Sequence, residues 1–183
     1  QRSINVRPTF EGYSNLGSTY FILRRFDEAV AAYEQAARFE HADFRTHGNL
    51  AKAYYWSGRR EEADESFRLA IEMGERTIAA APRSPDVMIL LAHYLVMAGE
   101  TERSLEMLDR AMRLRQDDAH YAYLAGLIHS QLGAREAALD WLESATRGGY
   151  SLAEIRNTIE LDGLRDEPRF RALLDAGTQQ SRP

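Results

Sequence analysis

Three side chains in the first half of the chain are of the types that hold a peptide. Arg45, Asn49 and Lys52 lie within eight residues of one another and are followed by Tyr55 and Trp56. A guanidinium, an amide and an ammonium donate hydrogen bonds to a peptide backbone or a carboxylate. Aromatic rings next to such donors are typical of interaction surfaces. The chemistry that these residues favour is therefore binding.

The residue types that catalysis or metal binding would need are not arranged for either. The sequence has no cysteine, no glycine-rich phosphate loop, no HExxH motif and no nucleophile elbow. His120 and His129 fall in one predicted helix, but nine residues apart, which is about 13 Å of rise. We expect no enzyme activity, no cofactor and no bound metal. The histidines are His41, His47, His93, His120 and His129.

The composition indicates a folded protein that does not span a membrane. Apolar residues make up 44% and charged residues 28% of the 183 positions, and no apolar run approaches the ~20 residues that span a membrane. The net charge of −5 argues against a general nucleic-acid binder. We expect a cytoplasmic location, with which the absence of cysteine is consistent.

A pattern of small residues recurs four times at a spacing of 34 residues, apart from one seven-residue slip. A fixed period of this length is the signature of stacked repeats. The copies occupy residues 10–43, 44–84, 85–118 and 119–152. Their small positions hold Gly17, Ala29 and Ala36 in the first copy, Ala51, Ala63 and Ala70 in the second, Ala92, Ser104 and Ala111 in the third, and Gly126, Ala138 and Ala145 in the fourth.

Each copy is predicted to fold as a pair of helices. In the first copy the apolar residues fall at i, i+3, i+4 and i+7, which is one face of an α-helix; they are Tyr13, Leu16, Gly17 and Tyr20. Small residues let two antiparallel helix backbones approach closely. Glycine suits the breaks between helices because it adopts positive φ without strain, and such glycines are Gly58, Gly99 and Gly133.

With these residues the chain resembles the tetratricopeptide repeat family over residues 10–152. The first two copies match that family's pattern best. The third has Ser104 at an alanine position, and the fourth has His129 at a usually aromatic position. The resemblance implies an all-α fold, a right-handed α-solenoid of four helix-turn-helix units closed by capping helices.

The seven-residue slip lies between the second and third copies, at residues 78–84. Seven residues are about two helical turns, so the second helix of copy two can lengthen without rotating its apolar face. Pro82 would then end that helix. The extension either changes nothing else or projects toward another domain or subunit.

The residues after the fourth copy are expected to close the array. We predict an N-terminal tail at residues 1–9, a cap at 153–176 and a C-terminal tail at 177–183. Asp166 is expected to cap the last helix. The last repeat of a solenoid leaves an apolar face unburied. The residues expected to cover Leu139 and Leu142 on that face are Ile155, Ile159, Leu161 and Leu164.

Residues 148–174 also resemble a tail that follows repeat arrays of this family in bacterial multidomain proteins, including Ser/Thr protein kinases and adenylate-cyclase-like regulators. The resemblance rests on Gly149-Tyr150, Ile155-Arg156 and residues 164–170. It implies a module of a larger bacterial protein. We interpret the start at Gln1 in the same sense, as a fragment or a processed protein.

The family resemblance also implies a concave groove lined by the first helix of each repeat. An apolar band is expected on it, although some of its members could pack against neighbouring helices; the band comprises Phe21, Ile22, Tyr55, Trp56, Val96 and Met97. The predicted ligand-binding residues are Phe21, Ile22, Arg45, Asn49, Lys52, Tyr55, Trp56, His93, Met97 and Tyr123.

The family's carboxylate clamp for acidic C-terminal peptides is disfavoured, because only Asn49 matches it and Ser14, Ser18, Asp86 and Leu90 do not. We therefore predict a non-enzymatic scaffold module that binds a more apolar protein or peptide segment, extended or helical, in the groove. The alternative is a structural module that pairs with a second copy, as a homodimer, through the same band or through the projecting second helix of the second repeat.

Overall fold

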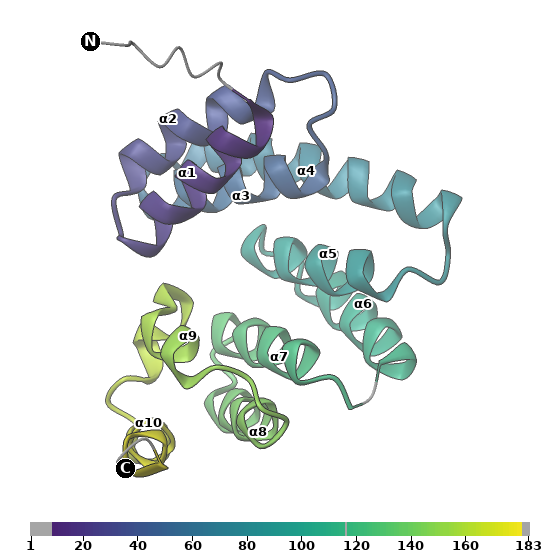
Figure 1. Ribbon diagram of the computed structural model, residues 1–183. Helices are drawn as coiled ribbons and strands as arrows, with labels where there is room; N and C mark the ends of the chain where they lie inside the picture. The colour runs from purple at the N-terminus through teal and green to yellow at the C-terminus, as the bar shows by residue number, and fades with distance from the viewer. Residues whose placement is uncertain (1–8, 116, 181–183) are drawn as a thin grey trace, which may run out of the picture. The chain divides into compact units, whose positions relative to one another are not determined.

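The computed structural model describes residues 9–115 and 117–180, which form helices and turns without a strand (Figure 1). The all-α fold is thus confirmed. Residues 1–8 and 181–183 of the predicted tails lie outside the described residues. The elements are α1 (Phe10–Ile22), α2 (Phe26–Ala37), α3 (Phe44–Trp56), α4 (Arg60–Ala80), α5 (Pro85–Met97), α6 (Thr101–Leu114), α7 (Ala119–Gln131), α8 (Arg135–Arg147), α9 (Leu152–Asn157), the 3₁₀ helix η1 (Ile159–Leu164) and α10 (Pro168–Gln180).

The chain divides into two compact units, one up to Arg76 and one from Thr77 onward. The division falls inside α4, which contributes to both. Each unit has its own helical hairpins and its own buried side chains.

In the first unit α1 pairs with α2, α2 packs against α3, and α1 also contacts α3. The α1–α2 pair is close because Gly17 has no side chain: a Cβ there would lie 2.7 Å from ring atoms of Tyr33. The Tyr33 hydroxyl in turn lies 2.9 Å from Ser18 Oγ, which fixes the ring. Burial raises the pKa of the Tyr33 phenol.

In the first unit, side chains cap the N-termini of α1 and α3. Thr9 Oγ1 accepts a hydrogen bond from the Gly12 amide at the start of α1, and the Asp43 carboxylate accepts from the Arg45 and Thr46 amides at the start of α3. Such caps satisfy amides that have no partner within the helix. Thr9, predicted to belong to the tail, is therefore part of the first helical element.

In the second unit α5 pairs with α6, α7 pairs with α8, and α5 lies beside α7. Gly126 repeats the role of Gly17, since a Cβ there would lie 2.9 Å from Leu142. The unusual Ser104 is fully buried, and its hydroxyl donates to the Ala92 carbonyl at 2.7 Å. This bond lets serine replace alanine because the buried hydroxyl is satisfied.

The turns inside the hairpins use positive φ angles, as predicted at Gly58, Gly99 and Gly133. The first hairpin is the exception: Arg24 takes this conformation at φ 57°. A non-glycine residue is strained there.

The seven-residue insertion lengthens α4, as predicted. This helix has 21 residues, whereas α6, the second helix of the next hairpin, has 14. It ends at Ala80, two residues before Pro82. Residues that precede a proline are disfavoured in the helical conformation, which explains why the helix stops there.

The C-terminal segment folds back onto the second unit, where η1 lies against α7 and α10 lies against α8 (Figure 1). The apolar side chains predicted to close the array are buried, namely Ile155, Ile159, Leu161 and Leu164. Arg169 attaches α10 to α8 through ion pairs with Glu136, Asp140 and Glu143.

Two predictions about the last helix were wrong. Helix α10 begins at Pro168, so Glu167 precedes it, and Asp166 instead forms an ion pair with Arg171. Proline at the first helical position lacks only an amide that the helix would leave unpaired. The helix also runs to Gln180, past the predicted end of the cap at residue 176.

We expect Gly17→Ala to lower the free energy of unfolding by about 1–3 kcal/mol, because the new methyl group must displace the hydrogen-bonded Tyr33 ring. In the matched control Gly163→Ala, the added Cβ meets nothing within 4 Å, and we expect a change within about 0.5 kcal/mol. Thermal unfolding followed by circular dichroism compares the two. Equal melting temperatures would contradict this account of the helix pairing.

A half-buried imidazole makes the stability depend on pH. His129 on α7 is half-buried and its Nδ1 has no hydrogen-bond partner, and burial lowers its pKa below 6.5. The unfolded chain therefore binds more protons than the folded chain just below pH 6.5, so the stability falls as the pH drops through that range. Burial also lowers the pKa of His47, so its protonation opposes folding over the same pH range.

We expect His129→Gln to reduce the loss of stability between about pH 7 and pH 5, because glutamine has no proton to gain. The stability of the double variant His47→Gln/His129→Gln should change even less over this pH range. Urea unfolding midpoints at several pH values measure this slope. A slope identical to that of the parent chain would show that protonation of His129 does not oppose folding.

Candidate functional site

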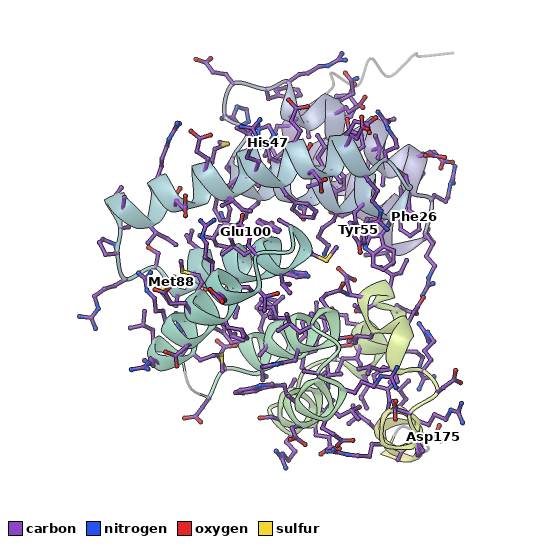
Figure 2. All side chains as sticks on the ribbon, turned by 180° about the vertical axis from the view of Figure 1, so that it is seen from behind. Phe26, His47, Tyr55, Met88, Glu100 and Asp175 are labelled. Carbon is purple, nitrogen blue, oxygen red and sulfur yellow. The ribbon has the colours of Figure 1, made fainter. Side chains whose placement is uncertain are left out.

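Four aromatic rings form a cluster at one end of the first unit. Phe21 from α1 and Phe26 from α2 have ring centroids 5.5 Å apart. Trp56 of α3 lies 6.4 Å from Phe26 and 5.3 Å from Tyr55. Figure 2 shows Phe26 and Tyr55 on the same side of this unit. The ends of three helices thus bring predicted site residues together.

Two large apolar side chains beside this cluster are exposed. Ile22, the last residue of α1, is 64% exposed, and Leu23, which follows it, is 60% exposed. They directly follow Phe21 in the sequence, and the turn at Arg24 and Arg25 leads into Phe26. The helix pairing does not require apolar residues here, because side chains this exposed contribute little to the core.

Cations border the cluster. Lys52 Nζ lies 5.3 Å from the centroid of the Phe21 ring, and the Arg60 guanidinium carbon lies 3.5 Å from that of Tyr55. The negative face of an aromatic ring attracts a cation at these distances. We call the whole group the aromatic surface; it comprises Phe21, Ile22, Leu23, Phe26, Lys52, Tyr55, Trp56 and Arg60.

Arg45 and Asn49 lie on the same helix as Lys52 but closer to its start. The exposed Arg45 guanidinium pairs with Asp43 at 3.3 Å and lies over the Phe44 ring. An exposed ion pair of this kind is weak. Asn49 is half-buried one turn later.

The indole nitrogen of Trp56 is buried and has no hydrogen-bond partner, although the residue as a whole is half-buried. A buried donor without an acceptor costs free energy. This nitrogen belongs to the aromatic surface but is covered by the protein itself, so it is not one of the groups that the surface exposes.

The predicted site residues of the second unit are buried instead. The exposed fractions of His93, Met97 and Tyr123 are 2%, 8% and 9%, and Val96 is at 8%. The prediction that Val96 and Met97 lie on an exposed band was therefore wrong. Helix α5 is apolar around most of its circumference, and a helix of that kind is buried on more than one face.

His93 and Tyr123 contact the C-terminal segment. His93 Nε2 lies 4.0 Å from Glu160 Oε1, and the Tyr123 hydroxyl lies 2.7 Å from Thr158 Oγ1. The Tyr123 ring also stacks on that of Tyr150, with centroids 4.2 Å apart. Burial raises the pKa of the Tyr123 phenol.

Within residues 9–115 and 117–180, no three histidine or acidic side chains are grouped as ligands of a metal ion. The same part of the chain has no helix that is both long enough and apolar enough to cross a membrane.

Sequence reasoning missed three members of the aromatic surface, namely Leu23, Phe26 and Arg60. A signal was present for the first two, because Ile22 and Leu23 form an apolar pair at a predicted helix break and Phe26 follows after only two arginines. Arg60 begins α4, and nothing in the repeat pattern distinguishes it from other arginines.

Two solved structures superimpose on most of this chain. A thermophilic TPR protein of Thermus thermophilus superimposes with a TM-score of 0.60 at 20% identity, covering 94% of this chain and 92% of that one. The pilF protein of Pseudomonas aeruginosa gives a TM-score of 0.51 at 18% identity, covering 95% and 77%. Likeness at this level of identity establishes the fold alone.

Relatives among curated proteins are much longer than this chain. Human tetratricopeptide repeat protein 7A is 30% identical over 112 residues, which are 58% of this chain and 13% of that protein. Bovine BBSome complex member BBS4 is 18% identical over 132 residues, which are 72% of this chain and 24% of that protein. The chain therefore spans at most a quarter of these relatives.

Three family models match the sequence, at residues 10–42, 44–74 and 63–128, and each describes the tetratricopeptide repeat. They stop short of the tail at residues 148–174, so its resemblance to bacterial multidomain proteins gains no support. Together they cover well over half of the 183 residues, and the chain belongs to the tetratricopeptide repeat family.

Proposed function

We propose that the chain is a non-enzymatic scaffold module that binds a protein or peptide segment at the aromatic surface of its first unit. Tetratricopeptide repeat proteins act as scaffolds for protein–protein interaction and are generally not enzymes. The observation that carries the location is the exposure of Ile22 and Leu23, at 64% and 60%, beside a cluster of aromatic rings. Exposed apolar groups of this kind mark interaction surfaces.

Burial of these two side chains supplies part of the binding free energy. Full burial of a leucine or isoleucine contributes about 1.5–3 kcal/mol relative to leaving it exposed. Phe21 and Trp56 are half-buried and offer ring area that is already held in place by its neighbours. Such fixed aromatic anchors lose little side-chain entropy on binding, and tryptophan and tyrosine are the residues that dominate interface energetics.

The cations at the border of the aromatic surface favour a partner that carries acidic groups. Lys52 and Arg60 lie over rings at the border of the aromatic surface, and Arg45 lies on the same helix as Lys52. Carboxylates on a partner would meet these groups at the rim while its apolar side chains cover Ile22 and Leu23. The ligand that fits best is an apolar segment with flanking acidic residues.

A phage-displayed library of random peptides, selected on the whole chain, tests this proposal. We expect the enriched peptides to be apolar with acidic flanks, and Ile22→Asp to weaken their binding at least about tenfold, because it places a charge in the apolar contact. Leu105→Asp is the matched control, since Leu105 is an exposed leucine of the second unit. Equal affinity of both variants would refute the proposed location.

The charge of Lys52 should contribute at low ionic strength. We expect Lys52→Glu to weaken binding of the selected peptide more at about 50 mM than at about 500 mM salt, because salt screens charges at the rim of an interface. Titration calorimetry at the two concentrations measures the difference. A loss of affinity that does not depend on salt would mean that Lys52 acts through packing alone.

The same surface could instead pair two copies of the chain, as a homodimer. We expect a monomer in light scattering at micromolar concentration. A dimer that Ile22→Asp dissociates, and that Leu105→Asp leaves intact, would replace the peptide-binding proposal with self-assembly.

A further inference from the structure

The segment between α9 and α10 is held on α7 in the way that a bound peptide is held. The main-chain carbonyl of Glu160 accepts hydrogen bonds from Ser130 Oγ at 3.0 Å and from Gln131 Nε2 at 3.3 Å. Both donors are side chains at the end of α7. Side chains that bond to the main chain of another segment recognise a backbone independently of its sequence.

Side chains of the segment are recognised as well. The Glu160 carboxylate lies 4.0 Å from His93 Nε2, and both side chains are only 3% exposed. Thr158 Oγ1 lies 2.7 Å from the Tyr123 hydroxyl. A buried acid needs polar neighbours, and α5 supplies His93 to this one.

Two apolar anchors flank the glutamate. Ile159 is 8% exposed and Leu161 is 1% exposed. The segment thus places one backbone carbonyl, one acid and one hydroxyl against α5 and α7, and it carries two buried apolar side chains. This mixture of a polar centre and apolar anchors is that of a specific peptide interface.

We propose that the α5–α7 face of the second unit is a peptide-binding site whose resident ligand is the chain's own segment Thr158–Leu161. The segment closes this site to partners, and a partner that opens it must carry a short segment of the same chemistry, with a hydroxyl, an acid and two apolar residues that can form a 3₁₀ turn. This inference does not depend on the aromatic surface, which lies in the other unit.

The attachment of the segment is compatible with release. Most of the segment lies in η1, which has six residues, as does the preceding α9, and helices so short have little stability of their own. Arg169, which holds α10 to α8, pairs with the largely exposed Glu136 and Asp140 and with the less exposed Glu143; exposed pairs are weak. The tether keeps the resident segment at an effective concentration on the order of 1 mM, so a partner in trans binds weakly until the segment is displaced.

A labelled synthetic peptide of residues 157–164, titrated against the full chain by fluorescence anisotropy, tests the proposal. We expect Leu161→Asp to bind this peptide at least about tenfold tighter than the parent chain does, because a buried charge expels the resident segment and frees the site. Adding Ser130→Ala and Gln131→Ala should abolish that gain, and a scrambled peptide should not bind. A Leu161→Asp chain with parental helix content that fails to bind the peptide would overturn the proposal.

Hydrogen exchange on the unaltered chain gives a second measurement in case Leu161→Asp does not fold. We expect a large excess of the peptide to accelerate amide exchange in residues 155–164, because the peptide takes the place of the resident segment. The scrambled peptide should leave exchange unchanged. Equal exchange with either peptide would show that the segment is a fixed part of the core.

Discussion

The close approach of paired helices at positions without side-chain bulk is the constraint on which the rest of the structure depends. Gly17 leaves room for the Tyr33 ring, and Gly126 does the same for Leu142. Every small position of the four copies is buried. Because these positions fix how each hairpin closes, they also fix which side chains remain on its outer faces.

The two units use those outer faces differently. In the first unit Ile22 and Leu23 stay exposed beside aromatic rings. In the second unit the corresponding helices are covered, since η1 lies against α7 and Glu160 reaches the neighbourhood of His93. The same hairpin architecture therefore presents one apolar surface to solvent and encloses another under its own chain.

The sequence predicted what depends on local spacing and failed where packing between distant segments decides. The period of small residues was sufficient to predict the helical hairpins and the longer α4. It could not show that residues 158–161 would cover His93 and Tyr123, because no spacing rule connects a cap to the face it meets. Nor could it show that Phe26 contacts Trp56, since that contact arises from where α2 begins relative to Trp56.

The central claim is that the first unit binds its partner at the aromatic surface, and the footprint of a bound peptide on the whole chain tests it most directly. Hydrogen exchange with and without a library-selected peptide should show protection at the end of α1, the start of α2 and the second half of α3, around Ile22, Phe26 and Tyr55. Protection confined to helices of the second unit, with these segments unchanged, would contradict the account.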